Sequence, residues 1–306
     1  MAQMMDRILD FENMAAAWRE TRKGGKSAGV DHWSVRRFSW HWEEHVRDLI
    51  EEVRGNRYKP RKLRIRYIPK RHGGRRRLAI PTVRDRVLQR AVLQVLSPKL
   101  DRMFLSCSYG YRPKRSLFHA VAAILKYRER GLTWVLDADI DDFFSSVDLG
   151  RMRNLIAQHV GDPQVVRLLY MWLEVGRVDR KRDKGLAQGM PISPLLSNLY
   201  LHELDWRLVR WRWSPVRYAD DFIVLTRDEA SARHCYGVVE GVLHDLKLRF
   251  EPSKTRITSF DEGFEFLGVY FDRESYVYTW EEKRVRVKGH RGPLWSMWDY
   301  FPHGYE

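Results

Sequence analysis

Two periodicities of hydrophobic and polar positions alternate along this chain of 306 residues, and together they predict a mixed fold of helices and strands. Apolar residues that recur near a 3.6-residue period predict amphipathic helices. In the first half of the chain these helices cover Met4–Arg22, Trp33–Val53, Asp85–Leu105 and Ser116–Arg130. In the second half they cover Arg151–Gly176, a stretch that ends at Arg210, and Asp228–Lys247.

Alternation of apolar and polar residues predicts the strands. The first two, Leu63–Pro69 and Leu78–Ile80, flank a turn at Gly73-Gly74 and predict a hairpin. The later strands fall at Trp134–Ile140, Val216–Thr226 (two strands around a turn), Phe264–Phe271, and 276–280 paired with 284–288. The pattern predicts an α+β fold in which helices cover one face of an antiparallel sheet.

Positive charge is concentrated in one segment of the chain. The formal net charge is +15, and the segment from Arg54 to Arg90 holds fifteen Lys or Arg residues against one acid. Such a segment repels itself unless it faces a polyanion, and the interleaved Tyr58 and Tyr67 are not typical of a solvated tail. Nucleic acid is therefore the expected partner, through phosphate contacts and counterion release. A ribosome-type or membrane-surface basic patch is the alternative.

Other features narrow the class of protein. Apolar residues are 44% and charged residues 31% of the chain, which is typical of a globular protein. No apolar run reaches the roughly 18 residues that span a bilayer, and the charged N-terminal segment does not resemble a signal peptide. We therefore expect a cytoplasmic protein with no membrane partner. Cys107 and Cys235 stand in no metal-ligand spacing, so we expect buried free thiols.

Three aspartates are the candidate catalytic residues. Asp139 ends a predicted strand, and Asp220-Asp221 occupy the turn of a predicted hairpin. Two like charges in a tight turn are costly unless a cation lies between them. Phosphoryl transfer to a growing strand uses two divalent cations about 4 Å apart, and Mg²⁺ prefers carboxylate oxygens. The set predicts a site for two Mg²⁺ ions, with Mn²⁺ as an alternative.

Around these aspartates the sequence resembles the reverse transcriptases, and among them the bacterial group II intron-like branch. Tyr218-Ala219-Asp220-Asp221 resembles the central palm hairpin of that family. The supporting segments follow the family's order and cover about Gly29 to Phe271: Gly29-Val30-Asp31, Ile68-Pro69-Lys70 through Ile80-Pro81, Tyr109 to Pro113 with Arg115-Ser116, Asp139-Ile140 with Phe143-Phe144, Gln188 to Pro194 with Asn198, Lys254-Thr255, and Phe266-Leu267-Gly268. Such an ordered series is far more specific than the four-residue match alone.

The resemblance implies an α+β right-hand polymerase with fingers, a palm built on an antiparallel sheet, and a thumb that is short or absent. It divides the chain into an N-terminal helical extension (1–56), fingers (57–130), a palm (131–271, with a helical insertion around 151–185) and a C-terminal hairpin with an aromatic tail (272–306). The implied activity is RNA-directed DNA polymerisation, a nucleotidyl transfer from deoxynucleoside triphosphates to a DNA or RNA primer on an RNA template.

The resemblance also implies a role for each site residue. Asp139, Asp220 and Asp221 would bind the metal ions, the Ile140 carbonyl would add a ligand, and Lys254 would protonate the pyrophosphate leaving group. The residues expected to contact the nucleotide or template are Lys70 and Arg76 at the triphosphate, Phe144 under the sugar, and Gln188 and Gly189 against the incoming nucleotide and template. The bulk of Phe144, which would block a 2′-hydroxyl, implies deoxynucleotides.

The C-terminal segment departs from the intron-encoded relatives. The 35 residues after Phe271 are too few for their three-helix thumb, maturase region and endonuclease. The tail Trp295–Phe301 is aromatic, and either forms an interaction surface or packs on the palm. We expect a partner protein, a structured noncoding RNA or self-association to complete the clamp, in CRISPR spacer acquisition or antiviral defence. Primer-independent, terminal-transferase-like synthesis and a non-catalytic RNA-binding scaffold are the alternatives.

Overall fold

The computed structural model describes residues 3–24, 27–69, 75–278 and 285–288, the last four by their backbone alone. The contacts divide the chain into two compact units. The first contains Met1–Leu105, Ile140–Glu203 and Leu243–Arg249, and the second contains Ser106–Asp139, Leu204–Val242 and Phe250–Glu306. Lys70, the turn at Gly73-Gly74 and the aromatic tail lie outside the described residues.

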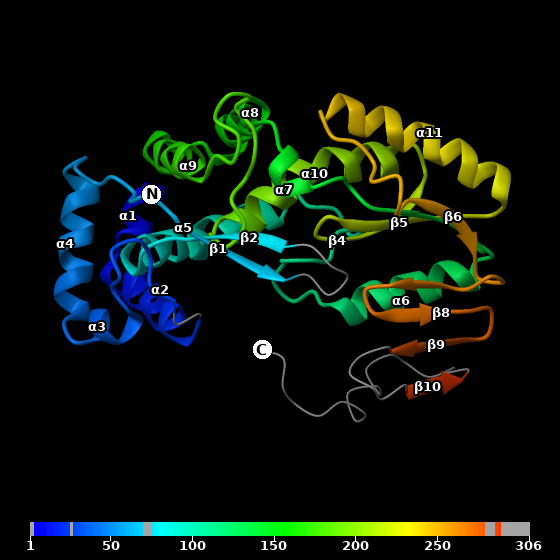
Figure 1. Cartoon of the computed structure of the whole chain (residues 1–306), viewed down its shortest axis with the longest axis horizontal. Coiled ribbons are helices and arrows are strands. Elements are labelled where there is room, and N and C mark those ends of the chain that lie inside the picture. Colours follow the sequence, from blue (N-terminus) through cyan, green and yellow to red (C-terminus); the bar gives the residue numbers. More distant parts are fainter. Residues whose placement is uncertain (1–2, 25–26, 70–74, 279–284, 289–306) are drawn as a thin grey trace. The chain divides into compact units, whose positions relative to one another are not determined.

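The first unit is mainly helical and is built around α5 (Val83–Asp101). Thr82 caps this helix by accepting from the backbone of Asp85. The apolar side chains of α5 are buried on several faces, as the neighbouring pairs Val87-Leu88, Ala91-Val92 and Val95-Leu96 show. Such all-round burial is typical of a central helix. The helices that pack against α5 are α1 (Met4–Ile8), α2 (Phe11–Lys23), α4 (Trp42–Arg54) and α8 (Leu149–Val160) (Figure 1).

The periodicity predicted three continuous helices, over Met4–Arg22, Trp33–Val53 and Arg151–Gly176. These three predictions are wrong, because the structure has two helices in each segment. The carboxylate of Asp10 accepts from the backbone of Glu12 and Asn13 and so begins α2 after the end of α1. A break at Trp40-His41 separates α3 (Val35–Ser39) from α4. Gly161, with φ +76°, ends α8, and α9 follows at Pro163–Gly176. Capping residues therefore account for the first and third of these boundaries, whereas His41 makes no side-chain cap at the second.

The first unit also contains the basic hairpin, helix α7 (Phe143–Ser146) and the first part of helix α10 (Ser193–Arg210). β1 (Arg64–Pro69) and β2 (Arg75–Ile80) pair antiparallel from Arg64 opposite Ile80, which confirms the predicted hairpin. α7 is short, and α10 continues along the chain from the first unit into the second.

The second unit is built on a four-stranded antiparallel sheet in the order β4-β5-β3-β6. The strands are β3 (Trp134–Ala138), β4 (Ser214–Tyr218), β5 (Asp221–Thr226) and β6 (Arg256–Ser259). Helix α6 (Leu117–Glu129) packs against β4, and its apolar residues form one core with Val135 and Leu225. Leu136 and Val224 point to the opposite face and are also buried. Both faces of the sheet are therefore covered, which corrects the prediction of one covered face.

A second antiparallel sheet, β7-β8-β9-β10, completes this unit. Its strands are β7 (Phe264–Phe266), β8 (Val269–Phe271), β9 (Ser275–Tyr278) and β10 (Val285–Lys288). The single strand predicted over Phe264–Phe271 is wrong, because Leu267 and Gly268 adopt φ values of +54° and +71° and reverse the chain. The predicted hairpin after it is confirmed as β9 and β10.

The last helix, the two cysteines and the polarity of the helices complete the description. Helix α11 spans Glu229–Asp245. Cys107 and Cys235 are free and buried, as the sequence predicted. None of the described helices combines the length and the apolar character needed to cross a membrane.

Candidate active site

The adjacent aspartates lie at the turn between β4 and β5. Tyr218 pairs with Asp221, so Ala219 and Asp220 form the tip of a two-residue turn. Ala219 adopts φ +60°, a left-handed conformation that costs a residue with a Cβ about 1–2 kcal/mol. Such a conformation persists when the surrounding structure holds it.

Arg217 holds this turn from inside the second unit. Its side chain is completely buried, at 0% exposure. Nε and one terminal nitrogen bind the two carboxylate oxygens of Asp205 at 2.7 and 2.6 Å, and that terminal nitrogen also donates to the Ser108 hydroxyl at 2.8 Å. The other terminal nitrogen donates to the carbonyl of Ala219 at 2.7 Å. Burial alone would lower the pKa of Arg217, but the Asp205 carboxylate outweighs it and raises the pKa.

The segment before α6 lies against the same turn. The backbone nitrogen of Arg217 donates to the Cys107 carbonyl, and that of Tyr109 donates to the Arg217 carbonyl, both at 2.8 Å. A Cβ on Gly110 would lie 2.4 Å from the backbone nitrogen of Ala219, so the close approach requires glycine. Residues 106–130, which the resemblance places in the fingers, belong to the second unit, which also contains the four-stranded sheet.

Asp139 comes from the strand beside this hairpin. β3 pairs with β5, so Asp139, one residue beyond β3, lies beside Asp221 at the start of β5. The Asp139 carbonyl accepts from the backbone of Glu251 at 2.8 Å, and its carboxylate forms an ion pair with Lys254. The hydrogen bond between the Lys254 ammonium and the Asp139 carboxylate raises the pKa of Lys254. Ile140, next along the chain, is buried.

The electrostatics of this sheet edge favour a cation. Withdrawal from bulk water, together with the charges of Asp220 and Asp139, raises the pKa of Asp221 to about 7. Asp221 as a residue is nevertheless exposed to solvent, so an ion can reach its carboxylate. Among the residues that the structure describes, no three or more His, Cys, Asp or Glu side chains are arranged so that they could hold a metal ion. The three carboxylates are nonetheless close enough to repel one another, and their oxygens are the donors that Mg²⁺ prefers.

The first unit carries the residues expected to contact the nucleotide. The backbone nitrogen of Ala79, on β2, donates to the carbonyl of Gln188 at 2.7 Å. Gly189 has φ +103°, and a Cβ there would lie 2.8 Å from the Ala79 carbonyl oxygen. Arg76 is exposed on β2, three residues before Ala79, whereas Lys70 lies outside the described residues. The basic hairpin and the Gln188-Gly189 loop are thus joined directly.

Phe144 lies beside the same loop. It is half-buried, whereas its neighbour Phe143 is buried in the core, with the two rings at 5.3 Å in a T-shaped arrangement. The backbone of Leu186 donates to the Phe144 carbonyl at 2.6 Å, and that of Gly185 donates to the Val147 carbonyl at 2.9 Å. The loop that leads to Gln188 therefore runs along the backbone of α7.

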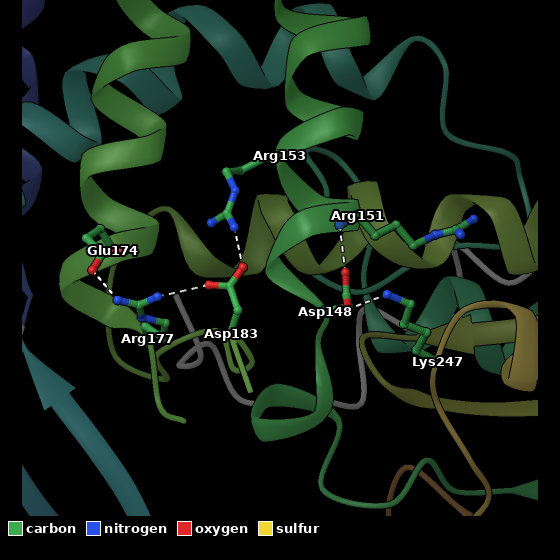
Figure 2. A network of polar contacts seen from close by, with 7 residues as sticks. All are labelled: Asp148, Arg151, Arg153, Glu174, Arg177, Asp183 and Lys247. Carbon is green, nitrogen blue, oxygen red and sulfur yellow. Dashed lines mark hydrogen bonds and ion pairs between the residues drawn. The ribbon is translucent and has the colours of Figure 1, made fainter. Parts of the chain in front are cut away.

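A network of ion pairs fixes the start of this loop (Figure 2). Figure 2 shows Asp183 between two arginines: one carboxylate oxygen pairs with Arg153 of α8 and the other with Arg177 at 3.1 Å. Arg177 also pairs with Glu174 of α9. Asp183 has φ +53°, and its carbonyl accepts from Leu149 at 3.1 Å. One carboxylate thus ties α8 and the segment after α9 to the loop.

An open hollow of about 640 Å³ lies beside this network. Asp148 caps α8 by accepting from the backbone of Arg151 at 2.8 Å and pairs with Lys247 at 2.6 Å (Figure 2). These residues and Arg153 line the hollow. Each of its three cationic side chains has a carboxylate partner, that of Arg151 being Glu203. The hollow therefore belongs to the scaffold of the first unit.

Comparison with known proteins decides the family. Residues 68–271 match the family described as reverse transcriptase (RNA-dependent DNA polymerase). The chain belongs to this family. Protein YkfC from Escherichia coli (strain K12) is 33% identical, over 85% of this chain and 80% of that protein. The group II intron-encoded protein LtrA from Lactococcus lactis subsp. cremoris is 30% identical, over 72% of this chain and 38% of LtrA.

The fold agrees with this assignment. The structure of apo telomerase from Candida tropicalis, truncated from the C-terminal domain, matches 81% of this chain and 60% of that one with a TM-score of 0.55. Its sequence identity is 14%, so the likeness shows the fold alone. The predicted α+β polymerase fold, the RNA-directed DNA polymerase class and the resemblance to group II intron-encoded enzymes are therefore confirmed.

Sequence reasoning missed the side chains that support the site of this reverse transcriptase. Arg217 was counted as one residue of an apolar strand, although a charge between Val216 and Tyr218 on a central hairpin is itself a signal of a buried partner. Nothing in the local pattern indicated that its partner is Asp205. The role of Asp183 in the loop before Gln188 was missed in the same way.

Proposed function

We propose that this reverse transcriptase adds deoxynucleotides to a primer on an RNA template, with Asp139, Asp220 and Asp221 holding two Mg²⁺ ions, or Mn²⁺ in their place. The observation that carries the proposal is the position of the three carboxylates at one edge of one sheet, from the adjacent strands β3 and β5 and the turn before β5. The raised pKa of Asp221 supports it, because a divalent cation would relieve that excess of negative charge. When bound, the ions would activate the 3′-hydroxyl and neutralise charge on the triphosphate.

Other residues would act on the nucleotide. Lys254, held protonated by Asp139, has a proton to donate to the pyrophosphate leaving group. Arg76, together with Lys70, would bind the triphosphate through charge-assisted hydrogen bonds. Phe144 is half-buried beside the loop that leads to Gln188, and its ring would lie under the sugar and exclude a 2′-hydroxyl.

The same proposal covers the template side and the division of the chain. Gln188 and Gly189 would lie against the incoming nucleotide and template, where the lack of a side chain on Gly189 leaves room for close approach. The Ile140 carbonyl would add a metal ligand. We assign the N-terminal extension, fingers, palm and C-terminal hairpin to 1–56, 57–130, 131–271 and 272–306.

The test is deoxynucleotide incorporation by the purified protein on an RNA template with a DNA primer and Mg²⁺. Asp220→Ala and Asp221→Ala should each lower the rate by at least about 10²-fold, the order of magnitude lost with one group that stabilises transition-state charge. Asp137→Asn is the matched control, because this carboxylate lies on β3, two residues before Asp139, but pairs with Arg256 at 3.2 Å. Full activity of Asp220→Ala would refute the metal assignment, and equal losses in all three variants would reduce it to a general charge effect.

The same assay separates the alternatives. Synthesis without an added primer would favour a terminal-transferase-like enzyme. Binding of RNA without incorporation, even after RNA from the host is supplied, would favour a scaffold. Phe144→Ala should raise incorporation of ribonucleotides relative to deoxynucleotides, whereas an unchanged ratio would remove Phe144 from sugar selection.

We further propose that the enzyme works in antiviral defence or in CRISPR spacer acquisition, with a partner protein, a structured noncoding RNA or a second copy completing the grip on the primer and template. The group II intron-like series of motifs supports this proposal. An integrase gene beside the coding sequence would favour spacer acquisition, and a noncoding RNA that copurifies with the protein would favour defence. Processive extension by an isolated monomer at high salt would contradict the need for a partner.

A further inference from the structure

The end of α10 and the turn after it form a surface in which tryptophan and arginine alternate. Residues 206–213 read Trp-Arg-Leu-Val-Arg-Trp-Arg-Trp, contain no acidic residue and lie in the second unit. Trp206, Val209 and Trp211 are 45%, 43% and 51% exposed, and they are three of the nine large apolar side chains exposed in the described part of the chain. We call residues 206–213 the Trp–Arg patch.

The backbone of the patch is held in a defined conformation. The nitrogen of Trp213 donates to the Leu208 carbonyl at 2.9 Å, and that of Arg212 donates to the Val209 carbonyl at 3.0 Å. This pair of bonds is the Schellman arrangement that ends a helix. Arg212 has φ +62°, at the position where glycine is the usual residue. An arginine is therefore kept there in spite of a conformational cost.

The side chains of the patch combine stacking surfaces with exposed positive charge. The guanidinium of Arg210 lies 4.8 Å from the ring centroid of Trp206, and both Arg210 and Arg212 are exposed. Trp213 is half-buried and its ring lies 5.8 Å from that of His234, which anchors the patch to α11. Cations near a helix C-terminus are favourable for the helix dipole. That effect accounts for the arginines but not for the exposed indoles beside them.

We propose that the Trp–Arg patch is an accessory binding site for single-stranded nucleic acid, and for RNA in particular. Bases of a single strand stack on flat aromatic faces, while guanidinium groups neutralise the phosphates between them. Strand β4 (Ser214–Tyr218) follows the patch directly and ends at the turn that carries Asp220. Its five residues span about 13 Å, which separates the patch from the turn. The patch is thus distinct from the carboxylate site, and the proposal does not depend on the metal chemistry.

Charge decides between the possible occupants. An apolar protein partner would have to desolvate the exposed guanidinium groups together with the indoles, without an acidic residue in the patch to compensate them. A polyanion with planar, stackable groups satisfies both features at once. In a duplex the faces of the bases are already stacked on one another. A duplex could therefore pair its phosphates with the arginines but could not stack its bases on the indole rings.

The experiment is fluorescence anisotropy of a labelled short oligoadenylate RNA bound to the full chain, with excess unlabelled RNA duplex present to occupy sites that recognise phosphates alone. Trp206→Ala combined with Trp211→Ala should weaken this duplex-resistant binding by about tenfold or more. Arg210→Gln combined with Arg212→Gln should lower the slope of log K against log salt concentration by about 0.7 for each phosphate that the variant no longer neutralises. A merely structural role would leave that slope unchanged.

Trp40→Ala is the matched control, because Trp40 is exposed at 66% but is followed within four residues by Glu43 and Glu44. Its affinity should equal that of the unaltered chain. Unchanged binding by the folded Trp206/Trp211 variant would overturn the proposal, and so would an equal loss in Trp40→Ala. Loss of binding to phosphatidylserine vesicles with RNA binding intact would also overturn it and assign the patch to anionic membranes. Extension of a short template should be unaffected, which keeps this test separate from that of the catalytic site.

Discussion

The ion pair between Asp205 and Arg217 connects the stability of the second unit with the geometry of the turn at Ala219-Asp220. Asp205→Ala would leave a guanidinium at 0% exposure without its carboxylate, where the native side chains meet at 2.6 and 2.7 Å. Loss of one partner of such a pair costs about 3–5 kcal/mol. This is a large part of the roughly 5–15 kcal/mol that stabilises a typical folded protein. We therefore expect a variant close to the limit of folding.

A double variant separates charge burial from positioning. Asp205→Leu with Arg217→Met removes both charges, so the penalty of an unpaired charge disappears. The Ala219 carbonyl and the Ser108 hydroxyl still lose the donor that they have at 2.7 and 2.8 Å. Each such buried group costs about 1–3 kcal/mol. Together the two groups cost about 2–6 kcal/mol, a range that overlaps the cost of Asp205→Ala, so the two variants should have similar stability. Only the double variant lacks the hydrogen bond from Arg217 to Ala219.

Two measurements on the same variants give the test. Urea unfolding gives the stability order, and primer extension well below the midpoint of thermal unfolding gives kcat and KM. We expect kcat to be low in the double variant, because no donor holds the Ala219 carbonyl, although this variant buries no unpaired charge. Turnover at the level of the unaltered enzyme in the double variant would refute the positioning role of Arg217. A loss of less than about 1 kcal/mol in Asp205→Ala would refute the reasoning on the buried pair.

Three further predictions concern other parts of the fold. Gly110→Ala would place a Cβ 2.4 Å from the nitrogen of Ala219 and should lower primer extension, whereas Gly237→Ala, with no atom within 4 Å, should leave it unchanged. Asp183→Asn keeps a residue that tolerates φ +53° but removes both ion pairs, so KM for deoxynucleotides should rise more than kcat falls in steady-state kinetics. Burial raises the pKa of Asp85 above 3.8, so the folded chain binds this proton more tightly than the unfolded chain, and the resulting stability is lost as pH rises through the folded pKa. The unfolding free energy of the unaltered protein minus that of Asp85→Asn should therefore fall as pH rises from 3.8 toward neutrality in urea titrations, and a rise in this signed difference would contradict the account.

The sequence pattern predicted the elements whose signals lie within a few neighbouring residues. The β1–β2 hairpin, the β3 strand and the β4–β5 hairpin were predicted because alternation and turn residues are encoded within a few positions. The errors fell where a continuous period hid a boundary. Asp10 begins a helix inside the predicted helix Met4–Arg22, and Gly268 reverses a predicted strand. Hydrophobic period alone does not register a cap or a left-handed turn residue.

The candidate site was predictable in its reacting groups and not in its support. The aspartates stood out because charges in apolar strands need a reason. The contacts that position them join distant parts of the chain: Arg217 reaches Ser108 across 109 positions of sequence, and Lys254 reaches Asp139 across 115. Single-sequence reasoning has no access to such pairings, because they exist only once the sheet and α10 are assembled.

The buried guanidinium of Arg217 also restricts local opening of the β4–β5 turn. Separation of the turn at Ala219 from the interior would break the hydrogen bond from Arg217 and disturb its pair with Asp205 and the backbone pairing with Cys107 and Tyr109. Local fraying of this hairpin tip is therefore coupled to the interior of the second unit. Amide protons of β4 beside the turn should exchange with solvent at a rate close to that of global unfolding, although the hairpin ends at the surface. If the amides exchange in this way, the carboxylates proposed to bind metal lie on a part of the unit that opens only with global unfolding.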